Sequence, residues 1–136
     1  MKSLKGAVSV LFVLCLLCLP TTRAFCETWM LLDAVTVVGP GPLKALTFAD
    51  FRTWTCDVTT TGNPTTVTVR MDGNQTGDML FDPAGMADVT LTSAQLAVGR
   101  GTFSMTDMPA RYLRVNLVTL SGGTSPTVTV VCTGVR

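Results

Sequence analysis

Residues 65–70 read Thr-Thr-Val-Thr-Val-Arg, and residues 127–130 read Thr-Val-Thr-Val. Both stretches are built almost wholly from β-branched residues. Such residues lose χ1 freedom in a helix and pack well on a pleated surface, so they favour strands. The alternation of threonine with valine also places one kind of side chain on each face of a sheet. These two stretches therefore predict a β-sheet protein.

The same pattern continues over most of the chain after residue 25. It predicts about eight short strands, separated by turn sequences rich in glycine, proline, asparagine and aspartate, such as 39–42 and 72–74. The strands are expected near 28–38, 51–60, 65–72, 78–82, 87–92, 100–105, 110–120 and 126–133, with one helical turn within 92–98. Strands at this spacing indicate an antiparallel sandwich or barrel, and we expect a single β-sandwich, all-β in class.

The first 24 residues have the layout of a secretory signal. Two lysines precede an apolar run at 7–19, and Ala24 ends a cleavage sequence of small residues. The apolar run is shorter than the ~20 residues that a membrane-spanning helix needs. We therefore expect a signal peptide at 1–24 and a β-sandwich domain at 25–136. The mature protein is expected to be secreted: extracellular, at the cell surface or periplasmic.

Composition argues against an enzyme. The chain has no histidine, and Glu27 is its one glutamate, so most of the usual acid–base set is missing. Charged residues make up 14% of the chain, against about 25% in an average protein. Loss of residues 1–24 removes three of ten basic residues and none of nine acidic ones, which leaves a net charge of −2. This balance disfavours nucleic acid and membrane as partners. No cofactor is expected.

Three cysteines follow the signal: Cys26, Cys56 and Cys132. Strand alternation puts Cys56 and Cys132 on the same faces as core residues, so a disulfide between them is the first choice. A bridge that closes so long a loop stabilises by about 4 kcal/mol in the chain-entropy model. Cys26 paired with Cys132 is the alternative, which would fit if the first and last strands are neighbours. In the first pairing Cys26 is spare, and it is either idle or links subunits.

A candidate calcium loop begins at Asp72, with the sequence Asp-Gly-Asn-Gln-Thr-Gly-Asp. Asp72, Asn74, Thr76 and Asp78 carry oxygen atoms at alternate positions, and a glycine stands at position six. Position twelve is Pro83, however, where such a loop needs a bidentate glutamate. A hairpin turn is the better interpretation, and no metal is expected. Asn74 also begins an Asn-x-Thr glycosylation sequence.

Other candidate residues have simpler explanations. No motif brings the aspartates together, so we expect them on the solvated surface rather than as a catalytic pair; they are Asp33, Asp50, Asp57, Asp88 and Asp107. Trp29 and Trp54 could stack on sugars if exposed, but their alternation with apolar residues predicts burial. The core is expected to contain Trp29, Leu31, Phe48, Phe51, Trp54, Val69, Leu80, Leu91, Phe103, Leu113, Val115 and Val130.

Three segments together resemble a known family: 67–74 (VTVRMDGN), 110–117 (ARYLRVNL) and 122–130 (GGTSPTVTV). Leu113, Val115 and Leu117 are expected to point inward in the second of them, with Tyr112, Arg114 and Asn116 outward. The segments look like the small jelly-roll sandwiches of tailed-phage virion proteins, which decorate capsids or build tails. There a strand ending in a "DG" turn precedes an "aRYiRvn" strand and a threonine-rich final strand. The resemblance covers 51–131. It implies a jelly-roll fold and a habit of assembling, here in an exported form, but no ligand site.

Two classes of function fit these observations. The first is a non-enzymatic, secreted structural subunit that self-associates into, or decorates, an extracellular surface structure or filament. Low charge and strand edges with little protection against pairing favour it, and its partner would be a second copy or a surface-layer protein. The alternative is a monomeric carbohydrate-binding or adhesive recognition module, whose partner would be a glycan.

Overall fold

The structure is a computed structural model, and it describes residues 26–46, 51, 53–77, 87–106 and 110–135. The expected signal peptide and the strand expected at 78–82 lie outside these residues. No helix within the described ranges is long and apolar enough to cross a membrane.

The described part of the chain consists mainly of strands. In chain order the elements are β1 (Cys26–Val35), β2 (Gly39–Pro40), β3 (Lys44–Ala45), β4 (Thr53–Thr61), β5 (Thr66–Asn74), β6 (Val89–Thr90), α2 (Ser93–Ala97), β7 (Arg100–Met105), β8 (Tyr112–Ser121) and β9 (Thr127–Val135). The helix is the single turn expected from the sequence. A capping box between Thr92 and Gln95 starts it, which satisfies backbone N–H groups that the helix itself leaves open.

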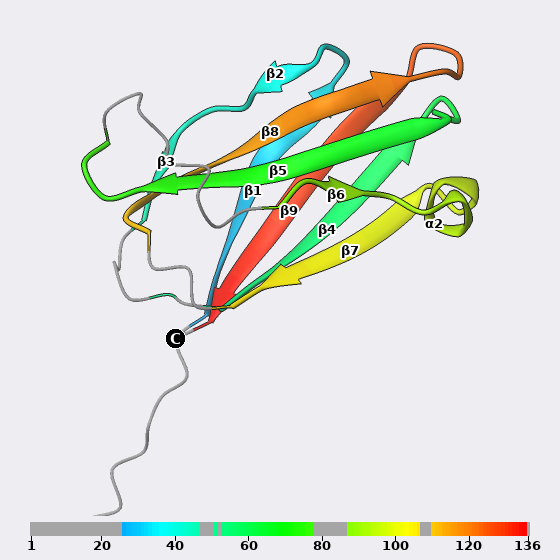
Figure 1. Cartoon of the computed structure of the whole chain (residues 1–136). Coiled ribbons are helices and arrows are strands. Elements are labelled where there is room, and N and C mark those ends of the chain that lie inside the picture. Colours follow the sequence, from blue (N-terminus) through cyan, green and yellow to red (C-terminus); the bar gives the residue numbers. More distant parts are fainter. Residues whose placement is uncertain (1–25, 47–50, 52, 78–86, 107–109, 136) are drawn as a thin grey trace, which may run out of the picture.

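The strands form two antiparallel sheets that pack face to face (Figure 1). Sheet A has the order β1-β9-β4-β7. Sheet B has the order β2-β8-β5-β6, and β3 also pairs with β8. The pairing is nested, because β1 pairs with β9, β2 with β8, β4 with β7 and β5 with β6. The chain thus follows the path of one long hairpin rolled into a sandwich, and the predicted antiparallel β-sandwich is confirmed.

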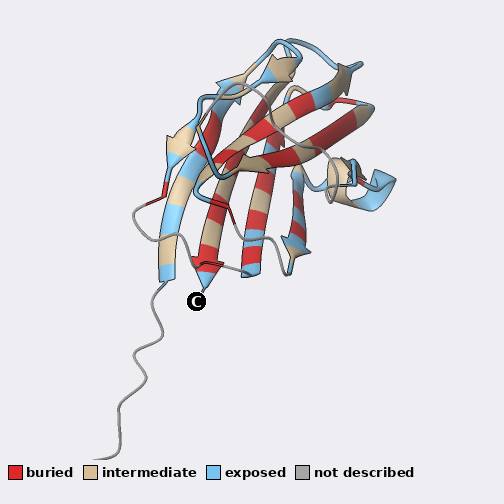
Figure 2. Cartoon of the chain, turned by 60° about the vertical axis from the view of Figure 1, so that its left-hand side comes forward, coloured by how far each residue is buried: buried red, intermediate tan, exposed pale blue. Residues whose placement is uncertain are grey.

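The core lies between the two sheets (Figure 2). Buried and more exposed residues alternate along β4, β8 and β9, as expected for strands with one face toward a core. Leu113, Val115 and Leu117 are buried, as predicted. Trp29 is half-buried, and Phe48 and Leu80 lie outside the described residues. The other expected core residues are buried.

The structure corrects several expected boundaries. Residues 72–74 continue β5 instead of forming a turn, since they pair with residues 112–114 of β8. Gly39 and Pro40 likewise pair with β8 as β2. In both places the backbone bonds offered by the long strand β8 outweigh the local turn propensity. The strand expected at 87–92 is limited to β6.

Candidate functional site

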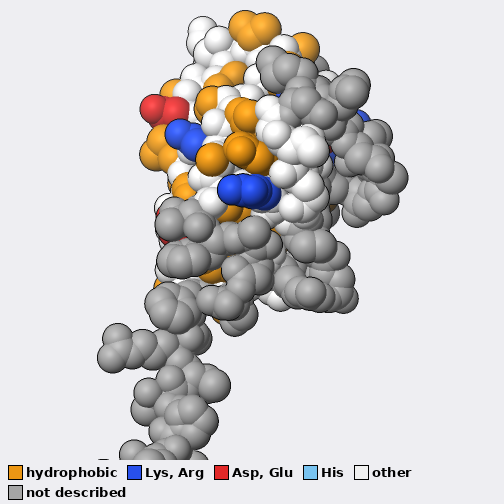
Figure 3. Space-filling model, turned by 90° about the vertical axis from the view of Figure 1, so that its left-hand side faces the viewer, with side chains coloured by type: hydrophobic (Ala, Val, Ile, Leu, Met, Phe, Trp, Pro, Cys, Tyr) orange, Lys and Arg blue, Asp and Glu red, His pale blue; other side chains and the backbone are white. Residues whose placement is uncertain are grey.

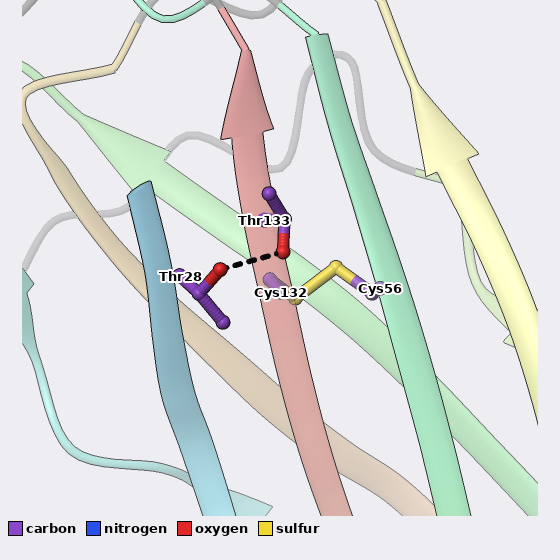
Figure 4. Close-up of a disulfide and its surroundings, with 4 residues drawn as sticks. All are labelled: Thr28, Cys56, Cys132 and Thr133. Carbon is purple, nitrogen blue, oxygen red and sulfur yellow. Dashed lines mark hydrogen bonds between the residues drawn. A yellow bond between two sulfur atoms is a disulfide. The ribbon is translucent and has the colours of Figure 1, made fainter. Parts of the chain in front are cut away.

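A disulfide joins Cys56 of β4 to Cys132 of β9 in the middle of sheet A (Figure 4). The two residues lie directly opposite each other, with their Cα atoms 4.0 Å apart, and both are fully buried. The Thr60 N–H donates to the Gly99 carbonyl, so the backbone groups of Thr60 point toward β7. Along a strand these groups point alternately to its two sides, so those of Cys56, four residues earlier, also point toward β7. Cys56 and Cys132 therefore form a non-hydrogen-bonded pair, the class in which facing Cα atoms come closest. This is the first-choice pairing from the sequence.

The alternative pairing of Cys26 with Cys132 is wrong. The first and last strands are indeed neighbours, as that pairing requires. Their register, however, places Cys26 opposite Val135 and Trp29 opposite Cys132. Cys26 is a free, exposed cysteine.

Asp72 is buried in β5, on the face of sheet B that points away from the core. Its Oδ1 accepts a hydrogen bond from Arg70 Nε at 2.9 Å. Its Oδ2 accepts one from Arg114 Nε and one from Asn116 Nδ2, both at 3.2 Å. Arg70 also reaches the exposed carboxylate of Asp88 at 3.5 Å. Two arginines and an amide therefore surround a buried carboxylate, which compensates the cost of its burial.

Part of this network could be predicted from the sequence. Alternation predicted that Arg114 and Asn116 face away from the core, but nothing local showed that they meet Asp72. The signal was the recurrence of polar residues at every second position of both strands, in Arg70 and Asp72 and again in Arg114 and Asn116. Their meeting depends on the β5–β8 register, which is a long-range property.

In the structure, Asp72 and Asn74 of the candidate calcium loop accept hydrogen bonds from protein groups. Both oxygens of Asp72 are engaged as described above. Asn74 Oδ1 accepts the Gly77 N–H at 2.9 Å, which is a local turn contact, and Thr76 is exposed. Asp78 lies outside the described residues. Within the described ranges there is no cluster of three or more cysteine or acidic residues that could hold a metal ion.

The remaining candidates are placed as surface and core residues. Asp33 and Asp88 are exposed, and Asp57 is partly exposed and lies 3.6 Å from Arg100. Asp50 and Asp107 lie outside the described residues. The ring centroid of Trp54 is 5.3 Å from that of Trp29 and 5.7 Å from that of Phe51. Trp54 is fully buried, so its ring takes part in the core and not in a surface platform.

The outer face of sheet A carries many hydroxyl side chains. The register aligns Thr28, Thr133, Thr55 and Ser104 in one row across all four strands. Hydroxyls pair across strands, with 2.9 Å between Thr28 Oγ1 and Thr133 Oγ1 (Figure 4) and 2.7 Å between Thr61 Oγ1 and Thr127 Oγ1. Because these groups already bond to one another, covering them loses fewer bonds to water than covering unpaired hydroxyls would.

An apolar patch lies on the side of the molecule that carries β2 and β3 (Figure 3). The exposed apolar residues in β8 and in the segments beside β2 and β3 are Val37, Val38, Leu43 and Val118, which are 71%, 52%, 38% and 36% exposed. The pairing of Gly39 with Leu117 places Val38 and Val118 at the neighbouring positions of the two strands. Grouped apolar side chains on a surface mark interaction sites more often than single ones do.

Comparison with known proteins finds similar folds among solved structures. Neither the protein-family models nor the curated protein sequences gave a match. Among solved structures, the chain is similar to the SPBc2 prophage-derived protein YomS, with a TM-score of 0.59 and 13% identity over 87% of this chain and 99% of that chain. It is also similar to the PBSX exported protein XepA, with a TM-score of 0.51 and 12% identity over 87% of this chain and 40% of that one. The shared feature is the fold, and it is consistent with the resemblance to phage proteins.

Proposed function

We propose that this protein is a non-enzymatic structural subunit that is exported and self-associates into, or decorates, an extracellular surface structure. The observation that carries the proposal is the outer face of sheet A. Threonine and serine side chains line up across its strands, Thr28 bonds to Thr133 and Thr61 to Thr127 through their hydroxyls, and the neighbouring strands β4 and β7 contribute the ion pair Asp57–Arg100. Such a face suits packing against another surface.

Export is supported by two independent features. The Cys56–Cys132 disulfide lies in the core, and structural disulfides persist in oxidising compartments outside the cytosol. The similar protein XepA is described as exported. Both features fit the signal peptide that the sequence predicts at 1–24.

A virion-like jelly roll is supported by the nested order of the strands. Jelly rolls consist of eight strands in two sheets, built from two Greek keys. Here four nested pairs, from the outermost β1–β9 to the innermost β5–β6, supply eight strands in two sheets, and β3 is a short addition. We take this order as the basis for the assembly role that the phage resemblance implies.

A recognition module that binds glycans remains the second candidate. A glycan site on a sandwich usually presents an aromatic face, since sugar rings stack on it. Trp54 is buried and Trp29 packs against it and against Phe51, so neither favours that function.

Electron microscopy of the secreted protein, with size-exclusion chromatography and light scattering on the same sample, tests the proposal. We expect filaments, rings or a defined oligomer. A monomer under all conditions that binds a glycan on an array would replace this proposal with the recognition module.

A further inference from the structure

Sheet B is blunted against the addition of another strand. Among the described residues, its edge strands β2, β3 and β6 have two residues each. The Gly41 N–H donates to the Val115 carbonyl, so alternation turns the nitrogens of Pro40 and Pro42 away from β8. Proline has no N–H, so these positions offer no donor to a further strand. The expectation that the strand edges carry little protection is therefore wrong for this sheet.

Sheet A has an open edge at β7. The bond from the Thr60 N–H to the Gly99 carbonyl fixes which residues of β7 bond to β4. Since the N–H and C=O groups of successive residues point to opposite sides of a strand, those of Arg100, Thr102 and Ser104 point away from β4. β7 contains no proline, and its pairing with β4 has no register shift. Within the described ranges no strand pairs with its outer side.

The opposite edge of sheet A, at β1, is open over its first half. Its pairing with β9 is regular from Cys26 to Met30, and alternation directs the backbone groups of Cys26, Thr28 and Met30 outward. After Met30 the register shifts twice, and Ala34 has a φ of 45°. Bulges of this kind end the part of an edge that can pair.

We infer that β7 of one copy pairs with β1 of the next copy, so that sheet A continues from molecule to molecule. This inference rests on the proposed self-association and adds the two edges of sheet A to its outer face as contact surfaces. Each edge offers three residues with outward N–H and C=O groups, at the same two-residue spacing. The four described strands of sheet A alternate in direction, so β1 and β7 run in opposite directions (Figure 1). A copy placed beside another in the same orientation therefore meets it with an antiparallel pair.

Charge favours this combination over a pair of identical edges. β1 carries Glu27 and Asp33 and no basic residue, whereas β7 carries Arg100 and no acidic residue. Two β1 edges would both be net negative and two β7 edges both net positive, while a β1–β7 pair joins edges of opposite net charge. An interface between two different edges is heterologous, so it produces an open filament or a ring and does not stop at a dimer.

The first test removes the central donor of the open edge. Thr102→Pro takes away an N–H that points outward, so the pairing of β7 with β4 keeps its bonds. Ala45→Pro is the matched control, since Ala45 occupies the corresponding outward position on the blunted edge of sheet B. We expect Thr102→Pro to shift the assembly midpoint in sedimentation velocity at least tenfold toward higher concentration. The control should assemble like the wild type, and near-ultraviolet circular dichroism should show both variants folded.

The second test traps the contact and does not depend on the proline variant. If all three outward residues of each edge pair, Thr102 faces Thr28, Arg100 faces Met30, and Ser104 faces the free Cys26 of the next copy. Facing Cα atoms in such a pair are about 5.5 Å apart, which a disulfide can bridge. Mild oxidation of Ser104→Cys should give a ladder of dimers, trimers and larger species on a non-reducing gel. Ala45→Cys, and Ser104→Cys combined with Cys26→Ser, should give no species beyond a dimer.

The outcomes separate this inference from the proposed function. A wild type that assembles, together with a folded Thr102→Pro variant that assembles equally well, overturns the β1–β7 contact and leaves the structural role standing. The same holds if Ser104→Cys forms no ladder while the wild type assembles. A wild type that stays monomeric, together with a Ser104→Cys variant that forms no species beyond a dimer, overturns both.

Discussion

Gly134 of β9 lies directly opposite Trp54 of β4, and a Cβ atom added to Gly134 would come within 2.7 Å of the indole ring. The ring has no room to retreat, because Trp29 and Phe51 pack against it. The glycine therefore provides the space that lets the largest core side chain lie flat against its own sheet.

We predict that Gly134→Ala destabilises the protein by about 1–3 kcal/mol, the usual cost of overpacking a core. Denaturant unfolding followed by tryptophan fluorescence measures the change. Val135→Ala, at the next and exposed position, should change the free energy of unfolding by less than about 0.5 kcal/mol. Equal stability of Gly134→Ala and the wild type would show that the tryptophan is not confined as described.

Removal of the disulfide should cost about 4 kcal/mol of stability, because the bridge closes a long loop between residues separated by 76 positions. The double variant Cys56→Ala, Cys132→Ala should unfold at much lower denaturant concentration than the wild type. Cys26→Ser should unfold like the wild type, since Cys26 is exposed and free. Peptide mapping under non-reducing conditions that found Cys56 and Cys132 as free thiols would contradict this account.

Asp72→Asn should destabilise the protein by about 1–3 kcal/mol, because it leaves the arginine donors Arg70 and Arg114 without their buried carboxylate. Asp88→Asn is the matched control. Its carboxylate is 48% exposed and lies 3.5 Å from Arg70, and exposed pairs contribute about 0–1 kcal/mol. Thermal unfolding of both variants makes the comparison. A larger loss from Asp88→Asn would mean that the network is organised differently.

Calcium should have no effect on stability. The oxygens of Asp72 that a calcium ion would need already accept hydrogen bonds from two arginines and an asparagine. Thermal unfolding with millimolar calcium and with a chelator should therefore give the same midpoint. A midpoint that rises with calcium, as expected when a ligand binds the folded state, would revive the loop as a metal site.

Export should produce a shortened chain. When the full chain is expressed in a secreting host, we expect the protein outside the cytoplasm to begin at Phe25, because Ala24 ends the predicted cleavage sequence. Intact-mass measurement of the secreted protein checks this. A protein that retains residues 1–24 and stays inside the cell would remove the basis for the proposed location.

The local pattern of the sequence was enough to predict the class of fold and the faces of its strands. Alternation in 110–117 separates Leu113, Val115 and Leu117 from Arg114 and Asn116, and the structure has the same division. The pairing of Cys56 with Cys132 followed from the same rule, because both residues share a strand face with core side chains.

The features that the sequence could not predict depend on register between distant strands. Residues 72–74 have the composition of a turn, but pairing with β8 keeps them extended. The same register brings Arg114 and Asn116 to Asp72. Gly-Pro-Gly-Pro at 39–42 also has the composition of a turn. Its prolines protect the edge of sheet B because Gly41 bonds to Val115 of β8, and this distant contact could not be predicted from the local sequence.

The central claim is that the exported domain assembles with copies of itself. Sedimentation velocity of the secreted protein over a hundredfold range of concentration tests it most directly, because self-association makes the distribution of sizes depend on concentration. We predict that species larger than the monomer appear and grow as the concentration rises. A single monomeric species over the whole range would contradict the account.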